Sequence, residues 1–246
     1  MTYIIKQDKI LTRVLEGVVM QNQKKEYIRK VTEFIKIHSD SYSEEEKEFI
    51  MKNACWGEKT NFVSDLLRQI YDEAGLLEEK DNIYLGFLKL LEENFDINQN
   101  ILEVGGGRIP SLGKHIATRQ KRGSITVYDQ QLIDTRSPHS NLILKKTSFT
   151  DETSLKGIGL MIGFMPCEAT KLTIKKACEN QIDFMIALCD GAPHKEDIVD
   201  GYNDWEAEMI YEASKGIREY GMGQLELLSL EQYDNPYPII YNKRKE

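Results

Sequence analysis

Three consecutive glycines directly follow a short apolar run in ILEVGGGRIP, residues 101–110. Glycine loses more conformational freedom on folding than any other residue, so a glycine run indicates a backbone that must turn sharply or let another group approach closely. Glu103 stands just before this turn, and Asp129 ends the next apolar run. An acidic residue roughly 20 residues after such a turn can bind ribose hydroxyls. A carboxylate beside the turn suits a cationic ligand better than a pyrophosphate, so the pattern predicts a nucleotide-like cofactor that carries positive charge.

The residues before this turn are predicted to form helices. Ser43 and Glu46 have the spacing of a capping box, further helices are expected over 61–74 and after Asp81, and Gly75 is placed to end the first of these. Apolar residues also recur at helical spacing near the N-terminus, at Tyr27, Ile28, Val31, Phe34 and Ile35. We therefore expect an all-helical N-terminal subdomain over residues 1–96, which acts as a cap or lid.

From residue 101 onward the pattern alternates between strands and helices. Strands are expected at ILEV, SITVYD, LILKK, GLMIGFM and DFMIALCD, and helices at PSLGKHIATRQKR, EATKLTIKKACEN and 203–220; QLELLSL and PIIYN can pair as the last two strands. This alternation predicts an α/β fold over residues 97–246, with a doubly wound, mostly parallel seven-stranded sheet and an antiparallel last strand. Ligands of such sheets bind at the carboxyl ends of the strands, where the glycines lie.

Composition and charge are those of a globular protein, with 41% hydrophobic and 29% charged residues. No apolar run reaches the roughly 18 residues that a membrane span needs, and the N-terminus lacks the apolar core of a signal peptide, so we expect a cytoplasmic protein without a membrane partner. The net charge of −8 argues against DNA as a partner, and the basic clusters at 23–30, 118–122 and 242–245 are interpreted as solvated surface. The four cysteines are widely spaced, so neither a disulfide framework nor a metal site is predicted.

The EVGGG segment resembles the first motif of class I S-adenosylmethionine-dependent methyltransferases, whose pattern is acidic-x-G-x-G. Asp129 matches that family's acidic residue after the second strand, and the resemblance covers residues 100–241, including the final strand pair. Ile109 and Ser148 depart from the family, which often has glycine and aspartate there. The resemblance implies S-adenosyl-L-methionine as the cofactor. It assigns the methionine portion to Glu103, Gly105, Gly106 and Gly107, the ribose to Asp129, and the rest of the cofactor pocket to Ser148, Phe149 and Phe164.

The segment GFMPCEAT ends the fourth expected strand, where this family carries catalytic residues. With LCDGAPH after the fifth strand, it distantly resembles a methyltransferase branch with a G-x-H-x-C-type motif, which includes RNA-modifying enzymes; the histidine is absent here. Two mechanisms stay open. In one, Cys167 and Cys189 act as the thiols of RNA cytosine-C5 methyltransferases do, by activating a pyrimidine through addition. In the other, the transfer is in line, with Glu168, Asp190 or His194 as the base.

Two other functions also stay open. One is a non-catalytic module that binds the cofactor, and the other is an NAD-dependent oxidoreductase. The dinucleotide fingerprint G-x-G-x-x-G disfavours the second, because Pro110 stands at its sixth position. The methyl acceptor is expected to be a small molecule or RNA, since the acidic composition favours the first and the motif favours the second. The sequence carries no signal for the oligomeric state.

Overall fold

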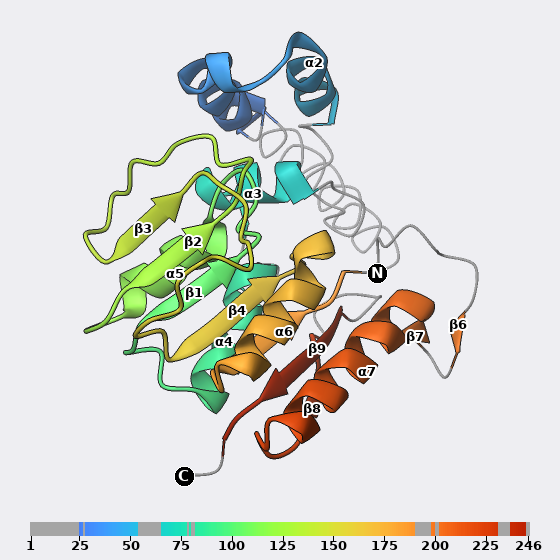
Figure 1. Ribbon diagram of the computed structural model, residues 1–246. Coiled ribbons are helices and arrows are strands. Elements are labelled where there is room, and N and C mark those ends of the chain that lie inside the picture. The colour runs from blue at the N-terminus through green and yellow to red at the C-terminus, as the bar shows by residue number, and fades with distance from the viewer. Residues whose placement is uncertain are drawn as a thin grey trace, which may run out of the picture. The chain divides into compact units, whose positions relative to one another are not determined.

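The computed structural model describes residues 25–26, 28–53, 65–77, 79, 82–189, 198–199, 202–230 and 237–244 (Figure 1). The chain divides into two compact units, Met1–Leu77 and Glu78–Glu246. Asp190 and His194 lie outside the described residues. No helix in the described ranges has both the length and the apolar character that a membrane span requires.

The described part of the first unit is helical. It consists of residues 28–37, the 3-10 helix η1 (Ser39–Ser41), α2 (Glu44–Asn53) and α3 (Asp65–Glu73). The predicted capping box is confirmed, because the Glu46 N–H donates to Ser43 Oγ at 3.1 Å and the Ser43 N–H donates to Glu46 Oε2 at 2.8 Å. Of the predicted N-terminal apolar face, Val31, Phe34 and Ile35 are buried. Ile28 is 36% exposed, which corrects its assignment to that face, and Tyr27 lies outside the described residues.

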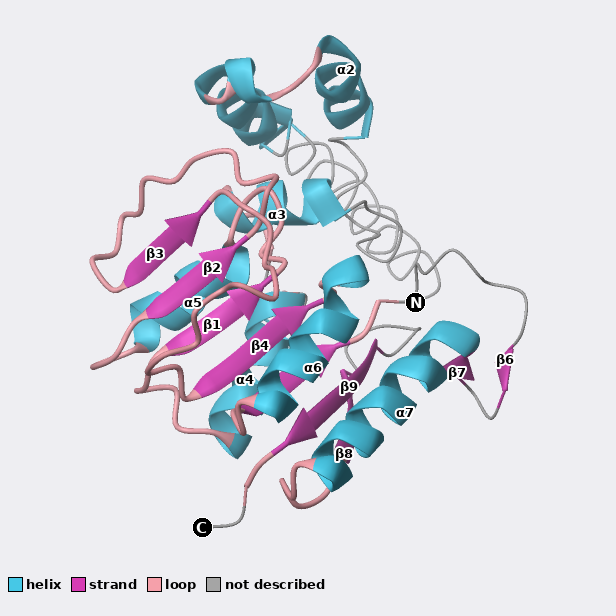
Figure 2. Cartoon of the chain, viewed as in Figure 1, coloured by secondary structure: helices cyan, strands magenta, loops and turns pink. Residues whose placement is uncertain are grey.

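The second unit contains a seven-stranded sheet with the order β3-β2-β1-β4-β5-β9-β8 (Figure 2). Its strands are β1 (Ile101–Val104), β2 (Ile125–Tyr128), β3 (Leu142–Lys145), β4 (Leu160–Phe164), β5 (Asp183–Ala187), β8 (Glu226–Leu230) and β9 (Tyr237–Asn242). The first five strands pair in parallel, and β9 pairs antiparallel with both β5 and β8. The predicted seven-stranded α/β sheet with an antiparallel last strand is therefore confirmed.

Helices cover both faces of this sheet (Figure 1). On one face lie α4 (Ile83–Asn94) and α5 (Ser111–Arg119), and on the other α6 (Thr170–Glu179) and α7 (Asp204–Glu219). Successive strand residues alternate between two cores: Ile101 packs toward α4 and α5, and Leu102 packs toward α6 and α7. Because both faces are buried, the strands read as nearly continuous apolar runs.

Helix α4 belongs to the second unit. Its buried residues lie in the same core as β1 and β4, and Asn82 caps its N-terminus by accepting the N–H groups of Tyr84 and Leu85. The boundary predicted from the sequence follows residue 96 and groups α4 with the preceding helices. In the structure, α4 packs with the sheet. A two-stranded ribbon of β6 (Ile198–Val199) and β7 (Tyr202–Asn203), which the sequence does not predict, precedes α7.

Candidate functional site

The glycine turn lies at the carboxyl end of β1, in the middle of the parallel strands. After β3 the chain crosses β1 to form β4 on its other side, so the turn stands where the strand order reverses direction. In open α/β sheets this switch point is where ligands bind. Gly105 and Gly107 have φ of +76° and +74°, a left-handed backbone that favours glycine. The Gly105 N–H donates to the Tyr128 carbonyl at 2.9 Å, which ties the turn to β2.

Close packing gives a second reason for glycine in this turn. A Cβ on Gly105 would stand 2.8 Å from Cα of Pro166, in the turn after β4, and a Cβ on Gly106 would collide with Val127 Cγ1. Side-chain carbons are essentially never found so close to other atoms. The turn is therefore held between β2 on one side and the end of β4 on the other.

Glu103 is buried on the face of β1 that packs against α5, with 1% of its surface exposed. Its carboxyl lies against two glycines: a Cβ on Gly113 would be 2.8 Å from Oε2, and one on Gly106 would be 3.6 Å from Oε1. Burial raises the pKa of Glu103 to about 8, with a further upward contribution from the charge of Asp129, while the Gly113 backbone N–H opposes the shift. The expected carboxyl beside the turn is therefore present, and its burial favours the neutral form.

Asp129 lies directly after β2 and is already oriented by the backbone. Its Oδ2 accepts the Gly107 N–H at 2.8 Å, and its Oδ1 accepts the Gln131 N–H at 2.7 Å. Each carboxylate oxygen has about two acceptor positions, so each retains one for a further donor. The acidic residue and the glycine turn, which are far apart in the sequence, thus form one hydrogen-bonded unit.

The segments after β2 and β3 meet beside Asp129. Ser148 Oγ donates to Gln130 Oε1 at 3.1 Å, and the buried Phe149 ring meets Tyr128 edge to face, with 6.1 Å between the ring centroids. Ser148 is exposed and Phe149 is not. Gln130 and Tyr128 are absent from the sequence-based prediction, although their positions on either side of Asp129 are a signal that would have identified them.

Phe164, the last residue of β4, points into the core beside α4. Its ring is 6% exposed and meets the rings of Tyr84 and Phe87 edge to face, at centroid distances of 5.2 and 5.5 Å. These contacts give the ring a packing role. Its predicted contact with a cofactor stays a prediction.

The turn after β4 has an unusual backbone. Met165 and Cys167 have φ of +53° and +46°, which is uncommon for residues that carry a Cβ. Cys167 is exposed, and its thiol donates to the Met165 carbonyl at 3.3 Å. Glu168 is exposed in the 3-10 helix η4 (Cys167–Ala169), just before α6. Cys189 follows β5 and is buried, so the two predicted thiols differ in their access to solvent.

Three buried polar atoms near this edge of the sheet have no hydrogen-bond partner among the described residues. They are Glu103 Oε2, Ser111 Oγ at the first residue of α5 and Thr170 Oγ1 at the first residue of α6. Buried polar atoms without partners are rare in proteins and often mark a place where a ligand or water binds. The residues present therefore fit a polar ligand at this edge.

No protein-family model and no curated protein matches this sequence. Among solved structures, a SAM-dependent methyltransferase from Aquifex aeolicus is similar, with 12% identity, a TM-score of 0.45, and coverage of 72% of this chain and 98% of that one. Human N-acetylserotonin methyltransferase in complex with SAM has 12% identity, a TM-score of 0.45, and coverage of 76% and 59%. The 16S rRNA methyltransferase KamB has 14% identity, a TM-score of 0.39, and coverage of 63% and 90%.

The strand order of this chain's own sheet decides the fold. A dinucleotide-binding fold has the order 3-2-1-4-5-6 with its sixth strand at the edge. Here the last strand, β9, is inserted antiparallel between β5 and β8. This is the sheet that the sequence resemblance to class I methyltransferases predicts. The final strand pair that the sequence resemblance predicts is therefore confirmed as β8 and β9, and β9 is the antiparallel strand beside β5.

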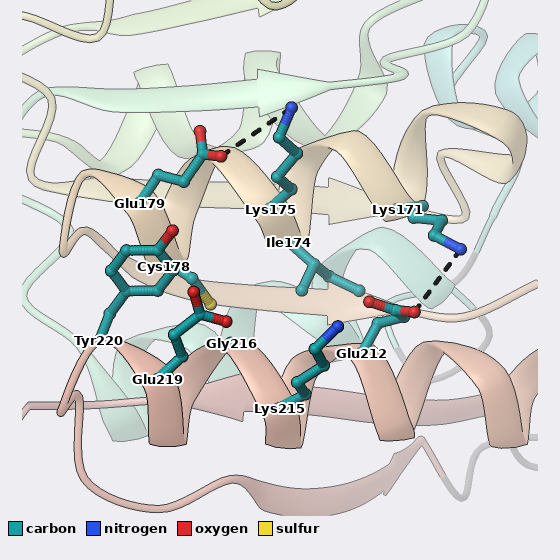
Figure 3. Close-up of a pocket in the computed structure, with 10 residues that line it drawn as sticks. All are labelled: Lys171, Ile174, Lys175, Cys178, Glu179, Glu212, Lys215, Gly216, Glu219 and Tyr220. Atoms are coloured by element: carbon teal, nitrogen blue, oxygen red, sulfur yellow. Dashed lines mark ion pairs between the residues drawn. The ribbon is translucent and has the colours of Figure 1, made fainter.

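A cavity of about 220 Å³ lies elsewhere in the second unit, between α6 and α7 (Figure 3). Cys178 and Gly216 lie in its wall, and a Cβ on Gly216 would be 2.8 Å from Cys178 Sγ. Lysines and glutamates surround the cavity, including the ion pair of Lys171 with Glu212 at 3.6 Å. None of the predicted site residues lines this cavity, so it is separate from the candidate site.

Proposed function

We propose that this protein is an S-adenosylmethionine-dependent methyltransferase. The observation that carries the proposal is the unit formed by the left-handed glycine turn and Asp129, joined by the hydrogen bond from the Gly107 N–H at the switch point of the sheet. The turn leaves space for a ligand, and the carboxylate beside it is fixed in position before any ligand binds. The buried carboxyl of Glu103 adds a group that favours a cation over a pyrophosphate.

The proposed cofactor contacts follow from these positions. The turn at residues 105–107 and Glu103 would hold the methionine portion, and Asp129 would bind the ribose through the acceptor positions that its backbone contacts leave open. Ser148 and Phe149 lie on the next segment and would contact the adenine. When bound, S-adenosylmethionine supplies an electrophilic methyl group.

The chain's own contribution to the transfer would be alignment of the acceptor with that methyl group. The turn after β4 lies directly against the glycine turn, since Pro166 fits where a Cβ of residue 105 would be. Glu168 is exposed beside this turn and is the described candidate for a base, while Asp190 and His194 stay candidates from the sequence. The different burial of Cys167 and Cys189 supports in-line transfer over a mechanism that needs both thiols at the acceptor.

Ligand binding tests the proposal most directly. We expect calorimetry to show binding of S-adenosylmethionine and its demethylated product, with a rise in Tm of roughly 5–10 °C at a hundred times Kd. Asp129→Ala should weaken binding about tenfold or more, because a charge-assisted hydrogen bond contributes about 1.5–3 kcal/mol. Asp151→Ala is the matched control, since Asp151 is exposed and its side chain pairs with Lys175 at 2.9 Å.

The outcomes separate the competing functions. Absence of heat and of any Tm shift with both compounds would refute the proposal, and tight binding of NADH instead would support an oxidoreductase. Binding of the donor without methyl transfer to any fraction of a cell extract would support a non-catalytic module. For an active enzyme, we expect label from the methyl donor to enter small metabolites or RNA, and the labelled fraction identifies the acceptor class.

A further inference from the structure

Glu103 stands out among the charged side chains of this fold because its carboxyl is fully buried while one of its oxygens lacks a partner. Its Oε2 has no hydrogen-bond partner among the described residues, and 1% of the residue is exposed; the nearby Gly113 N–H favours the ionised form, but less than burial disfavours it. A buried charge without a paired partner is costly, whereas a buried neutral carboxyl costs much less. The geometry alone therefore favours the protonated form of Glu103 in the protein without a bound ligand.

Among the described residues no cation acts on the pKa of Glu103, although Nε of Arg108, directly after the glycine turn, is itself buried. Glu103 lies among the glycine turn, β2, β4 and the first turns of α5, and β4 carries no titratable side chain. The titratable or charged side chains on the other elements near this end of the sheet are Tyr84, Arg108, Lys114, His115, Tyr128 and Asp129. Among them, Asp129 is the one whose charge acts on the pKa of Glu103, and it acts upward. Two acidic groups thus share one end of the sheet.

We infer that Glu103 holds a proton in the free protein and releases it when a cationic ligand binds at the glycine turn. The inference rests on the proposed function, because the sulfonium and ammonium groups of S-adenosylmethionine supply that cation. The cation stabilises the ionised carboxylate, the O–H bond of Glu103 breaks, and the proton passes to the solvent buffer. Glu103 is therefore a positioning residue whose protonation state depends on the charge of the ligand.

The direction of the pH effect follows from this exchange. Below about pH 8 the free protein carries the proton, so binding must release it and affinity rises with pH. Where release is complete, the dissociation constant falls by up to about tenfold per pH unit between pH 6 and pH 8. Above pH 8 the carboxyl is already ionised in the free protein, and the dependence ends. At pH 7 we expect release of up to about 0.9 proton for each ligand bound.

Calorimetry in buffers with different ionisation enthalpies measures this release directly. Wild-type protein is titrated with S-adenosylmethionine in phosphate and in imidazole buffer at pH 6, 7 and 8, and the difference in heat gives the number of protons. Glu103→Gln keeps the shape of the side chain and removes this titration, so we expect proton release near zero and an affinity nearly independent of pH from pH 6 to pH 7, where the ammonium group of the ligand stays protonated. Glu152→Gln changes an exposed glutamate away from the turn and should behave as wild type.

Each outcome bears on one of the two proposals. Binding to the wild type without proton release, or release that persists in Glu103→Gln, overturns the inference and leaves the proposed function standing. Absence of binding at every pH overturns the proposed function itself. Should Glu103→Gln fail to fold, infrared difference spectra of the wild type provide a second test: ligand binding must remove a carboxylic-acid C=O band and add a carboxylate band. An unchanged carboxylic-acid band overturns the inference.

Discussion

The ligand-free protein should lose stability as pH rises through the neutral range, because Glu103 holds a proton only when folded. Burial raises its pKa to about 8 in the folded protein, from 4.5 for an exposed glutamate. Between these values the folded state binds one proton more than the unfolded state, so the free energy of unfolding falls as pH rises. The contribution is complete below pH 4.5 and is lost by about pH 8. Replacing Glu103 by glutamine should remove this dependence.

The size of the effect follows from the same two values. One proton of difference changes the free energy of unfolding by about 1.4 kcal/mol per pH unit. From pH 6 to pH 8 the folded carboxyl begins to ionise, which reduces the full two-unit change to roughly 2 kcal/mol. We therefore expect the free energy of unfolding of Glu103→Gln to rise by roughly 2 kcal/mol relative to that of the wild type from pH 6 to pH 8. From pH 8 to pH 9 the two curves should run nearly parallel.

Urea unfolding at pH 6, 7, 8 and 9 gives this difference. Trp205 lies in α7 of the second unit, so its fluorescence in a Trp56→Phe background reports on the unit that contains Glu103. Titrating groups that do not interact with Glu103 contribute equally to both proteins and cancel in the difference. Glu152→Gln, an exposed position, controls for the loss of one surface charge. A constant difference from pH 6 to pH 9 would show that Glu103 is ionised and partnered in the folded state, and would refute the reasoning.

Two further experiments test the packing around the glycine turn and the burial of the cysteines. Gly105→Ala places a Cβ 2.8 Å from backbone at a φ of +76°, so we expect a loss of roughly 2–5 kcal/mol in urea unfolding. Gly221→Ala is its control, because Gly221 has a φ of +67° with nothing within 4 Å of the added carbon, and it should lose only about 1–2 kcal/mol; equal losses would exclude a steric origin. Alkylation followed by peptide mapping should label the exposed Cys167 at least ~10 times faster than the buried Cys178 and Cys189 in the native protein. Equal labelling of the three would contradict the burial of Cys178 and Cys189.

Much of the fold is readable from the sequence because both faces of the sheet are covered. Buried parallel strands appear as short apolar runs such as ILEV and LMIGF, and the helices between them keep a helical period. The strand order is not contained in these patterns, and its prediction depends on the family resemblance. The sequence also does not show which part of the chain α4 packs against, since an amphipathic helix has the same pattern whether its apolar face contacts a sheet or other helices.

The site is predictable in its parts and less so in its connections. Gly107 and Asp129 are each recognisable from the sequence, but their hydrogen bond depends on the parallel register of β1 and β2. Phe164 ends a strand at the right edge, yet alternation along β4 turns its ring toward α4. Gln130 stands next to Asp129 in the sequence, but its contact with Ser148 depends on where the segment after β3 lies. Tertiary contacts of this kind leave no local pattern in a single sequence.

The glycine turn has two functions that constrain each other. Gly105 leaves room for a ligand, and the same missing Cβ admits Pro166, so the segment after β4 rests on the turn after β1. The residues on either side of this proline, Met165 and Cys167, hold left-handed conformations that cost about 1–3 kcal/mol each and persist only where the surrounding packing enforces them. The Met165 N–H donates to the Ala187 carbonyl at 2.9 Å, which joins the same segment to β5. A methyl acceptor placed by this segment would therefore be held in a fixed relation to whatever the glycine turn binds, and in-line transfer depends on such alignment.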